Sequence, residues 1–292
     1  MLAAVLEQTV NGLMAGSVYV LIALGMVLIY GVMHVLNFAH GVLFMLGGYV
    51  CHFIFTRITG SYPAAIVLTM AALALIGIAL ERGVFRPLQG NLRNQVIASL
   101  GLILVIENLV IALWGPNALQ FKVPATETLV PLGELRFPLQ HLLVIAVTAT
   151  MVAGLFVFLK YSKFGIAIRA ASQDRQAAMV VGIPVERIDW ITFALGTALA
   201  ALGGALIGPL FLVFPQMGDA PMVKGLAGIL LGGMGSVPGA VIGGLLIGVI
   251  ESLSTLVLPT DYRDSVAFII MVAILLMRPR GLFGVRVRGD DG

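Results

Sequence analysis

Charged side chains are scarce in this chain of 292 residues: they make up 11%, whereas hydrophobic residues make up 60% and the mean hydropathy is +1.06. A soluble domain of this length carries about 25% charged and about 45–50% apolar residues. Because one globular core cannot hide this excess, we expect the lipid bilayer to be the solvent for most of the chain. The apolar runs are long enough to cross roughly 30 Å of hydrocarbon as helices, and they lack the alternation of a membrane barrel. The sequence therefore predicts an all-α integral membrane protein.

Sequence signatures of catalysis, metal binding and nucleotide binding are also missing. Cys51 is the only cysteine, which excludes an intrachain disulfide and a cysteine-rich metal site. The four histidines are scattered without metal-ligand spacing, and no Walker A pattern is present for ATP. A net charge of +3, carried by loops and the tail, does not indicate nucleic acid as a partner. We therefore expect no enzymatic activity and no cofactor bound by the chain itself.

Apolar segments divide the chain into about eight to nine transmembrane helices within a single polytopic domain, residues 1–292. We expect spans near residues 5–30, 41–55, 62–80, 96–114, 142–159, 188–213 and 265–277. Polar loops separate them, one of them at residues 81–95. In the span at 188–213 we expect breaks at the Gly203 and Gly204 pair and at Gly208 with Pro209, because glycine and proline weaken helix interiors.

Residues 225–248 form a glycine-rich run with nine glycines among aliphatic residues. Small residues let helix backbones approach closely in lipid, so we interpret the glycines as packing contacts; exposure of backbone to a substrate is the alternative. They fall on two helical faces, with Gly235, Gly239 and Gly243 on one and Gly228 and Gly232 on the other. Because Pro238 interrupts the run, we expect a broken or re-entrant pair of short helices inside the protein.

The distribution of basic residues predicts which ends of the helices share the cytoplasm. Three basic regions lie there in our interpretation, at residues 82–93, at residues 160–175 and in a cytoplasmic tail at about residues 278–292. The segment at about residues 115–140 has four prolines and balanced charge, so we place it outside. Counting spans back from these loops puts the N-terminus outside as well.

A polar island, residues 160–187, separates two long apolar stretches. Between Gly165 and Gly182 it predicts one short helix, because good helix formers stand between two glycines and Pro184 follows. Its polar side carries Arg169, Ser172, Gln173, Arg175 and Gln176, and its shallow apolar side carries Ala170, Ala177, Ala178 and Val181. Such a helix, held off the membrane by two spans, suits docking into a groove of another protein; an ordinary solvated loop is the alternative.

Four polar residues in or beside the spans are candidates for a translocation pathway. Glu107 lies in the middle of a span, where an isolated charge is costly, so it serves either as a functional acid or as a hydrogen-bonded structural group beside Asn108. Asn11 and Asn37 either line a polar path or hold helices together by hydrogen bonds. His40 is either a pathway residue or a hydrogen-bonded turn residue.

Several stretches, in this order and spacing, resemble one known family over essentially the full length. They are LNFAHG at 36–41 with MLGG at 45–48, FRPL at 85–88, RAASQD at 169–174 followed by Gly182 and Ile183, LGGMGSVPG at 231–239, YRD at 262–264 and RPRGLF at 278–283. Together they resemble the permease family of branched-chain amino acid ABC importers, and specifically its H-type subunit.

The resemblance implies a multi-pass permease of the bacterial inner membrane that imports leucine, isoleucine or valine. It also implies its partners: a second, homologous permease subunit, two cytoplasmic ABC ATPases that alone bind ATP, and a periplasmic or lipid-tethered solute-binding protein. The helix expected within the island, at about residues 165–182, would be the coupling helix that sits in a cleft of an ATPase. It matches that element at Arg169, Ala170, Asp174 and Gly182. It begins with Arg-Ala-Ala where the wider importer pattern has Glu-Ala-Ala, so a contact through glutamate is not implied.

Other functions remain open from the sequence. The same family includes permeases for urea, short amides and other amino acids, and no residue here separates those substrates. A different class of protein, an ion-coupled secondary transporter, would use Glu107 as its proton or cation site and would need no ATPase. A membrane scaffold that moves no solute is a third alternative.

Overall fold

The computed structural model describes residues 1–132, 135–233, 235–259, 262–278 and 281–283 of the chain. In these residues seven helical segments are long and apolar enough to cross a membrane. Five are single α-helices: α1 (Leu2–Met33), α4 (Leu92–Trp114), α6 (Leu139–Tyr161), α9 (Val185–Ile207) and α11 (Val237–Ser254). In the other two, α2 (His40–Ile54) continues through a π-helical turn at Phe55–Thr59, and α3 (Tyr62–Leu80) continues through further turns at Glu81–Phe85 and Arg86–Leu88.

Two shorter helices, α10 (Asp219–Gly232) and α12 (Arg263–Met277), complete the bundle. The prediction of a multi-pass, helical membrane protein with eight to nine membrane helices is confirmed. The loop predicted at 81–95 is shorter than expected, because the helical turns after α3 extend to Leu88. Most of the predicted tail, including residues 279–280 and 284–292, lies outside the described residues.

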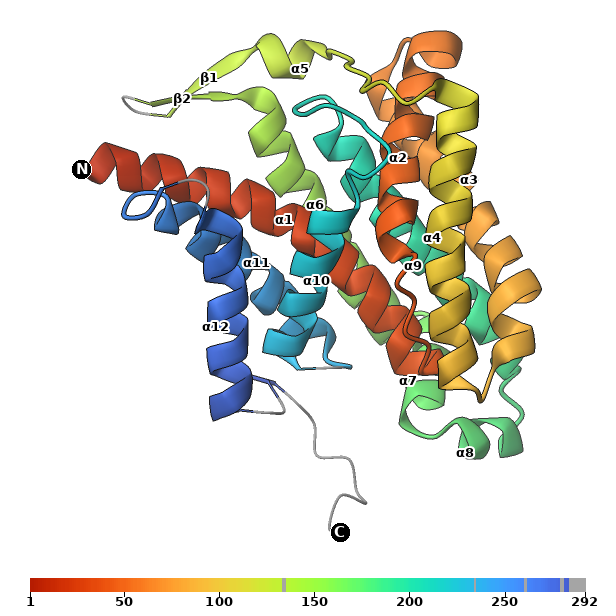
Figure 1. Cartoon of the computed structure of the whole chain (residues 1–292). Coiled ribbons are helices and arrows are strands. Elements are labelled where there is room, and N and C mark those ends of the chain that lie inside the picture. Colours follow the sequence, from red (N-terminus) through yellow and green to blue (C-terminus); the bar gives the residue numbers. More distant parts are fainter. Residues whose placement is uncertain (133–134, 234, 260–261, 279–280, 284–292) are drawn as a thin grey trace.

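The connecting segments gather at the two opposite ends of the bundle (Figure 1). At one end lies the segment predicted to be external, which contains the short helix α5 (Pro124–Glu127) and a hairpin of β1 (Leu129–Leu132) and β2 (Leu135–Pro138). The strands are antiparallel, with Val130 opposite Phe137. At the other end lie α7 (Lys163–Gln173) and α8 (Arg175–Val180), which form the polar island. This separation agrees with the predicted topology, and the hairpin is a small β addition to an otherwise helical fold.

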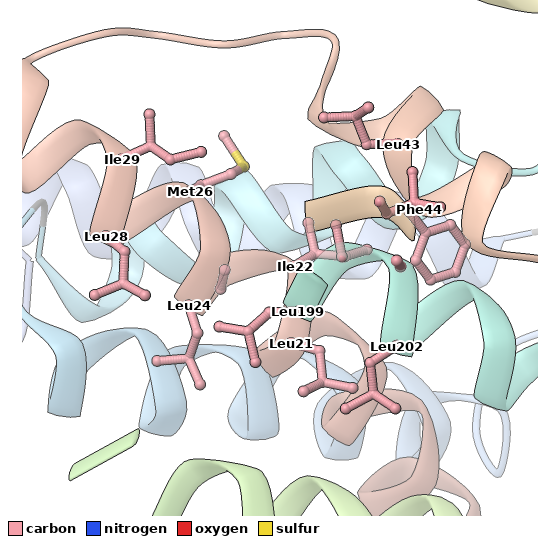
Figure 2. Close-up of a cluster of buried hydrophobic side chains, with 14 of the residues drawn as sticks. Leu21, Ile22, Leu24, Met26, Leu28, Ile29, Leu43, Phe44, Leu199 and Leu202 are labelled. Carbon is pink, nitrogen blue, oxygen red and sulfur yellow. The ribbon is translucent and has the colours of Figure 1, made fainter. Parts of the chain in front are cut away.

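Helix α1 lies at the centre of the bundle. Its 32 residues span about 48 Å at the usual helical rise, which exceeds the bilayer core, and Figure 1 shows it crossing the bundle obliquely. Nearly every residue from Val18 to Ile29 is buried, as expected for a helix that is apolar on all sides. It packs against α6, α9, α10 and α11. Figure 2 shows its side chains Leu21, Ile22 and Leu24 gathered with Leu43 and Phe44 of α2 and Leu199 and Leu202 of α9.

The chain between α1 and α2 is non-helical and lies inside the protein. Helix α1 ends at Met33, and the positive φ of 54° at the next residue, His34, stops the helix. The next residues run back to the start of α2, and Val35, Asn37 and Ala39 are buried. Irregular backbone at membrane depth is tolerated where protein covers it. Here Gly41 of α2 abuts Gly218 at the start of α10, so that the first turns of these two helices meet inside the bundle.

The predicted break of the sixth span at Gly203 and Gly204 is wrong. Helix α9 runs through both glycines without interruption and ends at Ile207, next to the Gly208 that was also expected to break it. Gly204 lies so close to the carbonyl of Phe44 in α2 that no side chain fits between the two backbones. The pair therefore serves close helix packing, which outweighs the low helix propensity of glycine.

The glycine-rich run forms two helical pieces, as predicted. Helix α10 ends at Gly232, and α11 starts at Val237 with Pro238 in its first turn and the hydroxyl of Ser236 accepting from the backbone N–H of Gly239 at 3.1 Å. Across the pair, Gly228 faces Gly243 and Gly244, and Gly232 faces Gly239. The packing interpretation of these glycines is confirmed. Gly235 is an exception, because it lies in the turn with a φ of 87° and not on the helical face expected.

We expect Gly204→Ala to destabilise the protein by about 1–3 kcal/mol, because the added methyl group must displace the backbone of α2. The matched control is Gly101→Ala on α4, where a Cβ atom would meet nothing within 4 Å. Thermal unfolding of the detergent-solubilised protein, followed by size-exclusion chromatography, measures both. Equal melting temperatures for the two variants would contradict the close contact between α2 and α9.

Candidate functional site

The polar island folds as two helices, so the prediction of one continuous helix between Gly165 and Gly182 is wrong. The break falls at Asp174, whose backbone is extended, with a φ of −154°. Its carboxylate oxygen Oδ1 accepts a hydrogen bond from the backbone N–H of Ala177 at 2.9 Å, so Asp174 is the N-cap of α8. Gly182 follows α8 with a φ of 83°, in agreement with the predicted end of the helical segment.

Helix α7 is fastened to the end of α6. The backbone N–H of Gly165 donates to the hydroxyl of Ser162 at 2.8 Å, and Gly165 abuts the backbone of Phe158 and Leu159 too closely for a side chain. Ile168 is buried against the bundle. The exposed Arg169 turns back toward α6 and donates to the carbonyl of Lys160 at 3.3 Å. These contacts hold α7 against the end of α6.

Helix α8 is fastened to α9 by a forked ion pair. The two terminal nitrogens of Arg175 donate to the carboxylate of Asp189 at 2.8 and 2.6 Å, and Gln89 donates to the same carboxylate at 3.1 Å. Asp189 is 1% exposed. These hydrogen bonds raise the pKa of Arg175 above its usual value. Beside this pair, Arg86 bridges Glu81 and Glu186 at 3.2 and 3.1 Å. No sequence pattern indicated this network, because hydrogen-bonded partners in it are up to 100 residues apart.

The apolar surface of the island differs from the predicted stripe. Ala178 is buried within the chain and Ala170 is half-buried, so neither forms a free apolar face. Instead, the end of α8 presents three large apolar side chains in a row: Met179, Val180 and Val181, which are 53%, 87% and 74% exposed. Exposed apolar groups of this size next to polar residues are typical of a docking surface. We call these three residues the α8 apolar tip.

The four predicted pathway residues do not come together. Asn11 lines a cavity of about 630 Å3 at the hairpin end of the bundle. Asn37 and His40 are buried beside a small void of about 20 Å3, and the side-chain oxygen of Asn37 accepts from the backbone N–H of Ala39 at 3.0 Å, a local hydrogen bond in the turn before α2. Glu107 is half-buried on α4, a helix that exposes most of its surface, and it lines none of the three cavities of about 630, 20 and 670 Å3.

The large cavity holds a cluster of charged residues that sequence reasoning missed. Glu251 of α11 is fully buried. Its Oε1 lies 2.8 Å from the ammonium of Lys224 and 2.7 Å from Nε of Arg263, and its Oε2 accepts from the hydroxyl of Tyr19 at 3.0 Å. Of its four members only Arg263 stands in a motif singled out in the sequence, YRD at 262–264. Nothing in the sequence indicated that the four meet, because they come from four helices, α1, α10, α11 and α12.

A second cavity lies at the other end of the bundle. It has a volume of about 670 Å3 and is enclosed by the ends of α1 and α6, by α7 and by the turn before α11. Val27, Phe156 and Val237 give it a mostly apolar wall, and Arg169 and Ser172 reach it from α7. The two cavities therefore lie toward opposite ends of α1, and the second one is next to the island.

Comparison with known proteins identifies the family. A family model described as "Branched-chain amino acid transport system / permease component" matches residues 8–275. The chain belongs to this permease family. A member from Pseudomonas aeruginosa, "High-affinity branched-chain amino acid transport system permease protein BraD", is 34% identical, and the match covers 96% of this chain and 95% of the relative.

A second relative agrees with this membership, and a solved structure shares the fold. The Escherichia coli permease "High-affinity branched-chain amino acid transport system permease protein LivH" is 32% identical, with coverage of 96% of this chain and 95% of that protein. Among solved structures, "PsaBC from Streptococcus pneumoniae in complex with Fab" has a TM-score of 0.52 at 14% identity, covering 96% of this chain and 97% of the other. That structural likeness shows the fold alone.

We expect Arg175→Met to destabilise the permease by about 3–5 kcal/mol, because it leaves the carboxylate of Asp189 buried without its cation. The double variant Arg175→Met/Asp189→Leu should recover most of this loss, since it removes the charge as well. Thermal unfolding in detergent measures both variants. If the double variant were as unstable as the single one, an unpaired buried charge would not be the cause.

Proposed function

We propose that this chain is a permease subunit of an ATP-binding-cassette importer that takes up branched-chain amino acids at the cell inner membrane. Its membership of the permease family supports this function, as do the names of its relatives, which specify high-affinity branched-chain amino acid transport. The observation that carries the proposal is the pair of short helices α7 and α8, which ends the bundle on the side away from the hairpin and presents an apolar tip. The chain itself is non-catalytic in this proposal and binds no cofactor.

The proposed complex contains a second, homologous permease subunit, two cytoplasmic ATPases and an external solute-binding protein. The α8 apolar tip enters a cleft of one ATPase, because removing these side chains from water favours association. Of the residues predicted for coupling, Asp174 and Gly182 would act indirectly by shaping the ends of α8, and Arg169 by holding α7 against α6. Ala170 is half-buried beside them.

Force from the ATPases would reach the membrane helices through two sets of contacts. One joins α7 to α6 at Gly165, and the other joins α8 to α9 through Arg175 and Asp189. Helix α9 in turn packs against α1, α2 and α3, so a movement of α8 is passed to the centre of the bundle. Opening the cavity at one end while closing the cavity at the other is the alternating access that an importer needs.

An ion-coupled transporter is the rival from a different class, and the position of Glu107 does not favour it. This acid is half-buried on an exposed helix, away from both large cavities and away from the charged cluster around Glu251. Permeases of the same family for urea, short amides or other amino acids are the nearer alternative. The mostly apolar wall of the second cavity favours an aliphatic solute over urea.

Val180→Asp should reduce both copurification of the ATPases and ATP-driven uptake by about tenfold, because it places a charge in an apolar contact. The matched control is Leu92→Asp, which changes an exposed apolar residue at the first turn of α4 in the same way. Pull-down of the ATPases and uptake by proteoliposomes containing the complete importer measure the effect. ATPase binding by Val180→Asp equal to that of the control would remove the docking role of the α8 tip.

Glu107→Gln should leave ATP-driven uptake of leucine within about twofold of the unsubstituted protein, because Glu107 lines neither large cavity and the barrier to transport should change little. Uptake is measured in proteoliposomes with ATP and, separately, with a proton gradient and no ATP. Transport driven by the gradient alone and lost in Glu107→Gln would replace the importer with the ion-coupled rival.

A further inference from the structure

The cavity of about 630 Å3 at the hairpin end has the size and the mixed lining of a small-molecule site. Such sites measure roughly 300–1,000 Å3 and combine apolar walls with a few polar groups. One part of the lining is apolar and includes Met14, Val18, Phe44 and Met217. Another part is the charged cluster, in which Arg263 and Lys224 surround Glu251. An aliphatic group and a charged group of one ligand therefore find matching surroundings in the same cavity.

Arg263 is the member of the cluster that is best placed to bind a ligand. Its Nε lies 2.7 Å from Oε1 of Glu251, so that the guanidinium is held on one side. Its two terminal nitrogens make no hydrogen bond to any residue that the structure describes, and the side chain is 37% exposed at the cavity wall. A guanidinium offers two parallel N–H groups that match the two oxygens of a carboxylate.

We propose that Arg263 binds the carboxylate of an amino acid as it passes through the permease, while Met14, Val18, Phe44 and Met217 contact its aliphatic side chain. This proposal rests on the proposed function and names the contact residues within it. Glu251 is a positioning residue: it orients Arg263 and is itself held by Tyr19 and Lys224. Its negative charge also weakens the attraction of the site for an anion, and a transport site needs such weakening because the solute must leave again.

The first test is uptake of leucine by proteoliposomes that contain the complete importer. Arg263→Gln should lower uptake at least about tenfold, because a charged hydrogen-bonding pair is lost. Arg263→Lys should retain part of it, because the charge stays and the fork is lost. The matched control, Arg57→Gln, removes an exposed arginine that does not line the cavity and should leave uptake within about twofold.

Stimulation of ATP hydrolysis by the loaded binding protein is measured in the same samples, because it reports assembly and docking without solute contact by Arg263. We expect Arg263→Gln to keep this stimulation while it loses uptake. Full uptake by Arg263→Gln would overturn the proposal and leave the importer function intact. Failure of the unsubstituted importer to take up leucine would instead overturn the proposed function.

A second test needs no variant and therefore decides the matter if Arg263→Gln does not assemble. Photo-leucine, a leucine analogue with a diazirine in its side chain, is irradiated with the unsubstituted importer during turnover, and the adducts are mapped by mass spectrometry. Adducts on Met14, Val18, Phe44 or Met217 that excess leucine suppresses are the expected result. Adducts only elsewhere on the chain, or none on it, would overturn the site.

Discussion

Close contact between helix backbones holds this bundle together and positions its other features. In lipid the hydrophobic effect does not drive helices together, so their association relies on packing and on small residues that let backbones approach closely. Helix α1 meets α11 at Gly12 and Gly16, where a Cβ atom would lie 2.7 Å from the Cα of Val249 and 3.0 Å from that of Leu245. Gly204 of α9 makes the corresponding contact with α2. These contacts place α1 at the centre and allow irregular backbone, such as the chain before α2, to be covered by protein.

Around this packed centre, charged groups are concentrated at the two ends of the bundle. At the island end, Asp189 is buried and paired with Arg175; at the hairpin end, Glu251 is buried and paired with Lys224 and Arg263. A buried carboxylate is costly unless it is paired, so each cluster strongly favours one arrangement of the helices that supply it. The first arrangement connects α8 to α9. The second connects α1, α10, α11 and α12 around a cavity.

The positions of the two large cavities fit alternating access, in which a permease opens to one side of the membrane at a time. Both are bounded by α1: Met14 and Val18 line the cavity at the hairpin end, and Val27 and Leu28 line the cavity next to the island. The stretch of α1 between them is deeply buried, with Leu21 to Leu24 fully enclosed. The two cavities are therefore separated along α1 by a closely packed stretch of that helix.

The membrane spans, the glycine-rich helix pair and the separation of the two ends could be predicted from the sequence, because lipid as a solvent imposes a local rule on every residue. The family could be predicted from the order and spacing of short motifs. Local rules were insufficient at three places. Asp174 divides the island because it caps α8, and Gly203 and Gly204 continue α9 because α2 packs on them. In addition, Asn11 lies in a different cavity from Asn37 and His40, which hydropathy alone does not predict. The charged cluster was decided by the tertiary structure only. Tyr19 and Glu251 are 232 positions apart, and hydropathy along a chain carries no information about which helices become neighbours.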